Sequence, residues 1–231
     1  MNKGNGRSQI MQNIQRAVNN PQLIVDRQRQ LPSFDPQPFE PRALVIRWQQ
    51  ELEALTGHVY GPLAPAAALD QAISLIQAQQ AEEILTWDDA DLPVAGLNAR
   101  LQAANIRAVQ PDDALDRQMI AGIPLGVTGA LAGLADTGSI VVANGPGRAR
   151  SASLLPTIHL ALLRVSDLYP NLPTWMARQG GSLLPTTANL VIITGPSRTA
   201  DIELNLVIGV HGPREIHVIL IDEYVLNPRQ I

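Results

Sequence analysis

The sequence predicts an α/β fold in which a mostly parallel sheet is flanked by helices. Short β-rich runs alternate with segments whose apolar residues recur at helical spacing. Such strand–helix–strand units place neighbouring strands parallel beneath covering helices. With 231 residues, 45% of them hydrophobic, the chain can bury the core that one large domain of this kind needs.

The N-terminal region is predicted to lie outside this domain. Residues 8–18 form a short polar helix, and the Pro-rich segment LPSFDPQPFEP at 31–41 is an extended arm or linker. We therefore expect an N-terminal helix and arm over 1–41 and a single α/β domain over 42–231. The arm is either a contact for another subunit or a plain linker.

The first half of the domain alternates helices with strands. Pro41 and Pro65 each favour the first turn of a helix. Each predicted helix has one apolar face, made by Leu44, Trp48, Leu52 and Leu55 in the first and by Leu69, Ile73 and Ile76 in the second. The runs 82–87, 105–109 and 123–128 are predicted strands, with a helix near 93–103.

An uncharged stretch at residues 118–135 has the length of a membrane helix, and its glycines have GxxxG spacing. Pro124 and four glycines make it a poor helix, and Asp136-Thr137-Gly138 then gives a turn. Buried strands and turns are the better interpretation, without a membrane span. The second half adds the β-like runs GLADTGSIVVA, TIHLALLRV, ANLVIIT and EIHVILI.

Composition excludes several kinds of function. The chain has no cysteine, so thiolate catalysis, zinc–thiolate sites and cysteine-held iron–sulfur clusters cannot be its own. A net charge of −4 without a basic stripe argues against nucleic acid as a partner. The N-terminus has no apolar signal-peptide core, so a cytoplasmic location is expected.

Three loops carry the candidate chemistry, because ligands of open α/β sheets bind where loops follow the carboxyl ends of strands. In ADTGS, Thr137 offers a hydroxyl and Gly138 can take a positive φ, although a tight hairpin turn explains both. In NGPGRARSAS, Arg148 and Arg150 offer guanidinium forks for a carboxylate or phosphate; a solvated basic loop is the alternative.

The third loop, ITGPSRTADIELNLVIGVHGP at 193–213, concentrates reactive groups between two apolar runs. Ser197 or Thr199 can cap a short helix whose first turn holds Asp201 and Glu203. Such a cap leaves Arg198 and His211 unexplained. A small-anion site is therefore predicted, although no P-loop, GxGxxG, HExxH or GxSxG motif is present.

The other histidines are assigned structural roles. His159 and His217 lie inside apolar strand-like runs, where a hydrogen-bonded core histidine is the usual case, and His58 is a strand or loop residue. The four histidines show no metal-ligand spacing, so no metal site is predicted.

Three segments, GVTGALAGLADTGSIVV, SLLPTIHLALL and TGPSRTADIELNLVIGVHGPREIHVIL, resemble the LUD-domain proteins of the lactate-utilisation protein C type (LutC/YkgG-like). The resemblance is dense over residues 123–222 and thin before them. It implies a fold related to the sugar-phosphate isomerase and CoA-transferase group (NagB/RpiA/CoA transferase-like). It also implies a subunit of a lactate-utilisation complex that oxidises L-lactate to pyruvate with iron–sulfur partner proteins, this chain holding no cofactor.

The residues suggest roles in binding a small anion such as lactate, pyruvate or a phosphorylated compound. Arg198, supported by Arg148, would bind the anion, and His211 would accept a hydroxyl proton. Hydrogen bonds would come from Ser197, Thr199, Thr137 and the Gly138 turn, while Asp201 or Glu203 would orient His211. Two other classes stay open: a free-standing CoA-transferase or sugar-phosphate isomerase-like enzyme, and a non-catalytic assembly module.

Overall fold

The computed structural model of this chain describes residues 5–18, 40–111, 119–120, 122–183, 187–200, 206–208 and 212–223. The chain divides into two compact units, Met1–Pro36 and Gln37–Ile231. In the first unit, helix α1 (Asn5–Val18) confirms the helix predicted at 8–18. The Pro-rich segment lies outside the described residues up to position 39.

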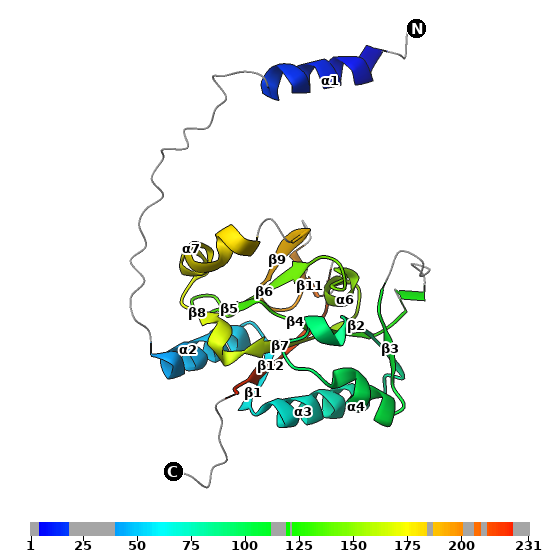
Figure 1. Cartoon of the computed structure of the whole chain (residues 1–231), viewed down its shortest axis with the longest axis vertical. Coiled ribbons are helices and arrows are strands. Elements are labelled where there is room, and N and C mark those ends of the chain that lie inside the picture. The colour runs from blue at the N-terminus through cyan, green and yellow to red at the C-terminus, as the bar shows by residue number, and fades with distance from the viewer. Residues whose placement is uncertain are drawn as a thin grey trace. The chain divides into compact units, whose positions relative to one another are not determined.

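A six-stranded parallel sheet forms the centre of the second unit (Figure 1). Every neighbouring pair in it is parallel, which confirms the predicted sheet type. Its strands, in spatial order, are β1 (His58–Leu63), β12 (Glu215–Ile221), β7 (Ile158–Arg164), β4 (Leu125–Gly129), β2 (Glu83–Thr86) and β3 (Arg107–Val109).

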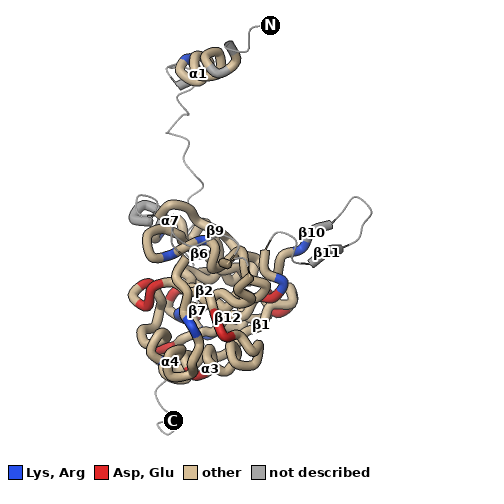
Figure 2. The backbone as a smooth tube through the Cα atoms, turned by 90° about the vertical axis from the view of Figure 1, so that its right-hand side faces the viewer, with Lys and Arg blue, Asp and Glu red and all other residues tan. Residues whose placement is uncertain are grey.

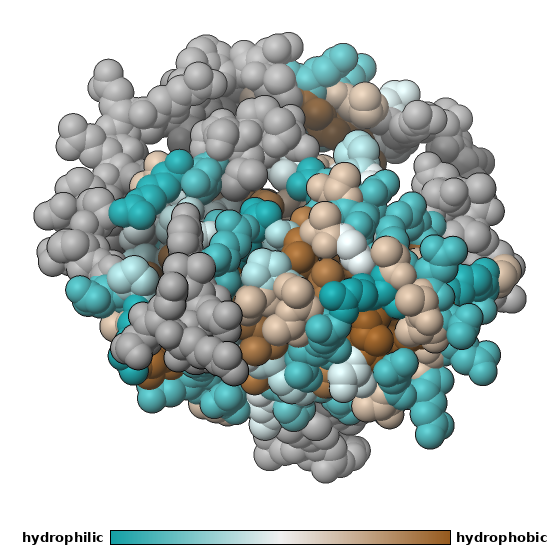
Figure 3. Space-filling model, turned by 60° about the horizontal axis from the view of Figure 1, so that its bottom comes forward, coloured by the Kyte–Doolittle hydropathy of each residue, from teal (hydrophilic) through white to brown (hydrophobic). Residues whose placement is uncertain are grey.

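Two helices cover one face of this sheet. Helix α3 (Pro65–Ala78) buries Leu69 and Ile76, and α4 (Leu97–Ala103) packs beside it (Figure 1). Both predicted helices are confirmed, with α4 starting later than position 93. The surface seen from the side of these helices mixes hydrophilic residues with small apolar patches (Figure 3).

A second sheet lies on the opposite face from α3 and α4 (Figure 1). Strand β5 pairs parallel with β8 and antiparallel with β6, and β6 pairs antiparallel with β9. Its strands are β8 (Leu168–Tyr169), β5 (Ala132–Leu134), β6 (Ser139–Asn144) and β9 (Asn189–Ile193). Helix α7 (Leu172–Leu183) contacts β8, whereas α6 (Ser151–Leu154) packs on β4, β7 and β2 of the main sheet.

Helix α2 (Pro41–Ala54) joins the two sheets. It contacts β1 of the main sheet and β8 of the second sheet. Trp48 is fully buried, and its Nε1 donates a hydrogen bond to the Ser139 carbonyl at 3.0 Å. The apolar face predicted for this helix is therefore the face that packs, although Leu44 and Leu55 are only half-buried.

Within the uncharged stretch at 118–135, residues 125–129 and 132–134 form strands β4 and β5 rather than one long helix. Within the described parts of the chain, no helix is both long and apolar enough to cross a bilayer.

The helix predicted after Ser197 is wrong. Strand β10 (Arg198–Ala200) pairs antiparallel with β11 (Leu206–Ile208), so Arg198 lies opposite Ile208. The capping pattern fits a helix locally, but pairing with the apolar run that follows satisfies the backbone groups of these residues instead. Figure 2 shows this hairpin at one side of the domain, with α4 and α7 at the other.

Candidate anion-binding cleft

A cleft of about 380 Å³ lies at the carboxyl ends of strands β2, β4 and β7. Residues at the ends of these three strands line it: Trp87 and Ala130 directly follow β2 and β4, and Arg164 is the last residue of β7. Strands β2 and β4 are neighbours in the sheet. From β2 the chain passes through α4 to β3, towards one edge of the sheet, whereas from β4 it passes to β7, towards the other edge. Ligands of open α/β sheets bind where the strand order reverses in this way, so the topology itself selects this cleft.

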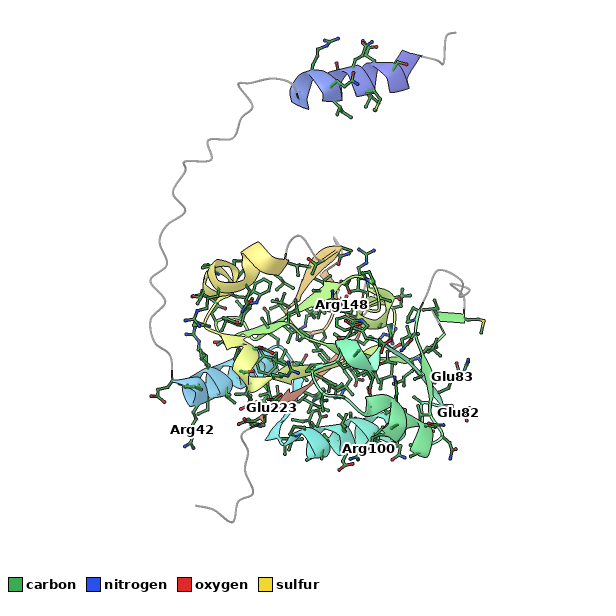
Figure 4. The ribbon with its side chains drawn as sticks, viewed as in Figure 1. Arg42, Glu82, Glu83, Arg100, Arg148 and Glu223 are labelled. Carbon is green, nitrogen blue, oxygen red and sulfur yellow. The ribbon has the colours of Figure 1, made fainter. Side chains whose placement is uncertain are left out.

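Arg148 enters the cleft from a tight turn between β6 and α6 (Figure 4). Gly145 and Arg148 exchange backbone hydrogen bonds of 3.2 and 2.9 Å across this turn. The turn is attached to the loop after β2, because Trp87 Nε1 donates to the Ala149 carbonyl at 3.1 Å and the Asp88 amide donates to the Gly147 carbonyl at 3.2 Å. Arg148 is therefore held at the cleft by contacts from a loop that lies about 60 positions earlier in the sequence.

Gly147 is required where this turn crosses the loop after β2. Its φ is +72°, and a Cβ there would lie 2.4 Å from Oδ2 of Asp91. The same Asp91 carboxylate is 3.6 Å from Nε of Arg148, a loose ion pair. A side chain at position 147 would thus displace the partner of Arg148.

A second arginine reaches the cleft from the end of β7. One guanidinium nitrogen of Arg164 donates to the Pro93 carbonyl at 2.6 Å, which ties β7 to the loop after β2. Its Nε lies 3.4 Å from the Glu223 carboxylate. Asp167 follows on the next turn, and burial raises the pKa of its carboxyl group, with Arg164 opposing and Glu223 adding to that shift.

Three buried N–H donors of the cleft lack a hydrogen-bond acceptor among the described residues. They are Nε of Arg148, Nε of Arg164 and Nε1 of Trp175. Buried donors are rarely left unpaired, because each costs about 1–3 kcal/mol in lost solvation. All three belong to residues that line the cleft, which makes it a candidate site for a ligand with hydrogen-bond acceptors.

The turn that holds Thr137 and Gly138 is structural. Gly138 has a φ of +63°, and a Cβ there would lie 2.3 Å from the backbone nitrogen of Leu52, so the glycine lets this turn pack on α2. The Thr137 hydroxyl is 2.7 Å from the hydroxyl of Ser139, which is 2.7 Å from that of Thr194. The hairpin-turn alternative thus accounts for both residues.

Arg198 holds its loop to the end of α2. Its guanidinium donates to the Leu55 carbonyl at 2.8 Å and to the Thr56 hydroxyl at 3.0 Å. The Ser197 amide donates to the Pro213 carbonyl at 2.9 Å, so the structure brings the two ends of the 193–213 segment together, as the loop hypothesis requires.

Arg148 and Arg198 are far apart. Ser139, which contacts Thr194 in the loop of Arg198, begins strand β6, whereas Asn144 at its other end precedes the turn of Arg148. Five strand steps separate the two ends by about 17 Å. Arg148 lines the cleft, whereas the Arg198 guanidinium binds Leu55 and Thr56, so the structure does not bring the two arginines to one site as predicted.

The predicted catalytic residues His211, Asp201 and Glu203 lie outside the described residues. Thr199 is in β10, but its side chain is not described. Roles for these four residues remain predictions.

The sequence analysis missed Arg164, Asp167 and Trp175. Arg164 and Asp167 follow a strand that is buried over nearly all its length, and polar residues at the carboxyl end of such a strand are the signal that would have pointed to them. Trp175 lies on α7, a helix that the sequence analysis did not predict.

Together the fold and the cleft define an open-sheet α/β protein with a cleft lined by N–H donors at its topological switch point. Residues 47–221 match the model of the LUD domain, and the chain belongs to this family. The predicted family membership is confirmed.

Several curated proteins share this family. The chain is 34% identical to lactate utilization protein C of Halalkalibacterium halodurans over 164 residues, 67% of this chain and 70% of that protein. It is 29% identical to lactate utilization protein C of Macrococcus caseolyticus over 234 residues, 96% of each. Protein YkgG of Escherichia coli is 34% identical over 166 residues, 68% of this chain and 71% of that protein.

A solved structure supports the fold. A DUF162 family protein from Deinococcus radiodurans superposes with a TM-score of 0.54, covering 80% of this chain and 99% of that chain at 16% identity. At this identity the likeness concerns the fold alone.

Proposed function

We propose that this chain acts in lactate utilisation by binding a small carboxylate, L-lactate or pyruvate, in the cleft between Arg148 and Arg164. The names of its relatives support the pathway. The observation that supports the ligand class is a set of three buried N–H groups without a hydrogen-bond acceptor on residues that line one cleft, although Nε of Arg148 and of Arg164 each lie near a carboxylate. Guanidinium groups bind carboxylates through paired, charge-assisted hydrogen bonds.

The cleft can bind a hydroxy acid in a defined orientation. In this proposal Arg148 and Arg164 bind the carboxylate, and the Trp175 indole donates to an oxygen of the ligand. Asp167, whose carboxyl pKa is raised by burial, lines the same cleft and can exchange a proton with a ligand hydroxyl.

Oxidation of L-lactate to pyruvate releases two electrons and two protons. The chain has no cysteine to hold an iron–sulfur cluster, so we assign electron transfer to iron–sulfur partner proteins in the cytoplasm. This subunit would then position the substrate, and its partners would accept the electrons.

Isothermal titration of the full chain with L-lactate and pyruvate tests the ligand. Arg148→Ala is expected to weaken binding roughly ten- to a hundredfold, because a hydrogen bond to a charged group contributes about 1.5–3 kcal/mol. Arg148→Lys keeps the charge but loses the planar fork, so it should recover only part of the affinity. Arg198→Ala is the matched control, since its guanidinium is bound to Leu55 and Thr56 at the end of α2 and does not line the cleft.

Each outcome separates the remaining hypotheses. Binding lost in Arg198→Ala but kept in Arg148→Ala would contradict the cleft and return the site to the 193–213 segment. Ribose 5-phosphate or CoA binding without lactate or pyruvate binding would favour the free-standing enzyme. If no ligand binds and the Arg148→Ala gene still restores growth on lactate, the assembly module is the better hypothesis.

A further inference from the structure

A second group of polar side chains lies at the amino ends of the strands of the main sheet, whereas the cleft lies at their carboxyl ends. His58 and Glu215 are the first residues of β1 and β12, and His217 follows two residues later. Strands β1 and β12 lie side by side (Figure 1), and their parallel register pairs His58 with His217, although the two are far apart in the sequence. One potential ligand atom from each of the three residues lies within 4.8 Å of the others.

We propose that His58, Glu215 and His217 bind a divalent transition-metal cation of the zinc class at this amino edge of the sheet. Two imidazoles and one carboxylate, with a fourth position left to water, are a typical ligand set for accessible zinc. This inference is independent of the function proposed for the cleft.

The distances fit such a cation. Nε2 of His217 and Oε2 of Glu215 are 3.3 Å apart. Zinc–ligand bonds of about 2.0–2.1 Å in a tetrahedron require about 3.3 Å between ligand atoms. His58 is exposed and stacks on His217 with ring centroids 4.6 Å apart, so its imidazole can turn towards the cation without displacing a packed neighbour.

His217 is prepared for metal binding by its surroundings. Its Nδ1 is 3.0 Å from the Tyr60 hydroxyl, which can accept an N–H from Nδ1 and so leave the Nε2 lone pair facing Glu215.

The carboxyl end of helix α3 adds an electrostatic field that favours a cation at this site. Leu75 and Gln79, from the last turn of α3 and its C-cap, line the same small cavity as His217. The carboxyl end of a helix carries partial negative charge, which stabilises a nearby cation.

Metal titration of the full chain tests this site after chelator dialysis. Zinc should bind with one-to-one stoichiometry, and cobalt(II) should give the intense visible absorption of a four-coordinate complex. His58→Ala and Glu215→Gln are each expected to weaken zinc binding at least about tenfold. Both side chains are exposed, so circular dichroism should show that these variants fold.

Glu82→Gln is the matched control. Glu82 is an exposed carboxylate that directly precedes β2, at the same edge of the sheet but three strands from β12 (Figure 4). Zinc affinity unchanged in this control but reduced in both ligand variants would establish the site. No zinc binding by the wild type, or equal affinity in the wild type and either ligand variant, would overturn it.

Discussion

Gly126→Ala is expected to destabilise the domain by roughly 3 kcal/mol, the upper end of the usual cost of overpacking a core. A Cβ at position 126 would lie 1.9 Å from the carbonyl oxygen of Ala152 in α6. Strand β4 cannot retreat, because β2 and β7 pair with it on both sides. The clash is with backbone, so no side-chain rotation can relieve it, and α6 must move.

The displacement of α6 should also affect the cleft. The turn that carries Arg148 leads directly into α6, so we expect Gly126→Ala to weaken carboxylate binding as well as stability. Urea unfolding followed by tryptophan fluorescence measures the stability change, since all three tryptophans are buried in this domain.

Gly6→Ala is a suitable control for this substitution. Gly6 lies in helix α1, and nothing is within 4 Å of the position that its Cβ would take. The urea concentration at the unfolding midpoint of the Gly6→Ala variant should match that of the wild type. A Gly126→Ala midpoint equal to that of Gly6→Ala would show that α6 does not pack on β4 as described.

Acid is expected to remove roughly 3 kcal/mol of stability through His159 alone, at about 1.36 kcal/mol for each unit of pKa shift. This side chain is fully buried in β7, and burial lowers its pKa from 6.5 to about 4. Its Nε2 is 2.8 Å from the Thr128 hydroxyl, whereas Nδ1 has no hydrogen-bond partner among the described residues. The site therefore accepts only the neutral imidazole.

The direction in which stability changes with pH follows from proton uptake by the unfolded chain. Between pH 6.5 and about 4, the unfolded chain binds a proton at His159 and the folded chain does not. His159 therefore leaves the free energy of unfolding unchanged above pH 6.5 and lowers it as the pH falls from 6.5 towards 4. His217 acts in the same direction, since its pKa is also lowered, whereas Asp167 acts in the opposite direction because its pKa is raised.

His159→Gln isolates this contribution. Glutamine can keep a hydrogen bond to Thr128 but does not titrate, so the free energy of unfolding of the variant should fall less steeply with acid. The informative quantity is the wild-type free energy minus that of the variant, measured in urea across this pH range. A difference that does not change with pH would mean that His159 titrates normally in the folded protein.

Local sequence patterns were sufficient for most of the elements. Pro41 and Pro65 start helices because proline favours the first turn, and the apolar spacing behind each proline selects the buried face. The β-rich runs became strands, and His159 and His217 are buried, hydrogen-bonded histidines as predicted. The glycine-rich turn before α6 was also recognised as the position of a ligand-binding arginine candidate.

Pairing partners decided what local patterns could not. Residues after Ser197 have a helix-capping pattern, yet they form β10 because β11 supplies its hydrogen bonds. The sequence analysis grouped Arg148 with Arg198 as guanidinium groups that hold one anion, but the two residues follow loops near opposite ends of strand β6. Arg164 joins Arg148 instead, because β7 ends at the cleft.

By itself, then, the sequence determined the fold class and the parallel strands, since these depend on composition and periodicity within short windows, and its longer motifs carried the resemblance to the family. Only the tertiary structure decided which loops share a cleft and which side chains meet. His58 and His217 show the reason: their proximity depends on the order and register of β1 and β12 in the sheet. Order and register arise from contacts between distant segments, which no local spacing encodes.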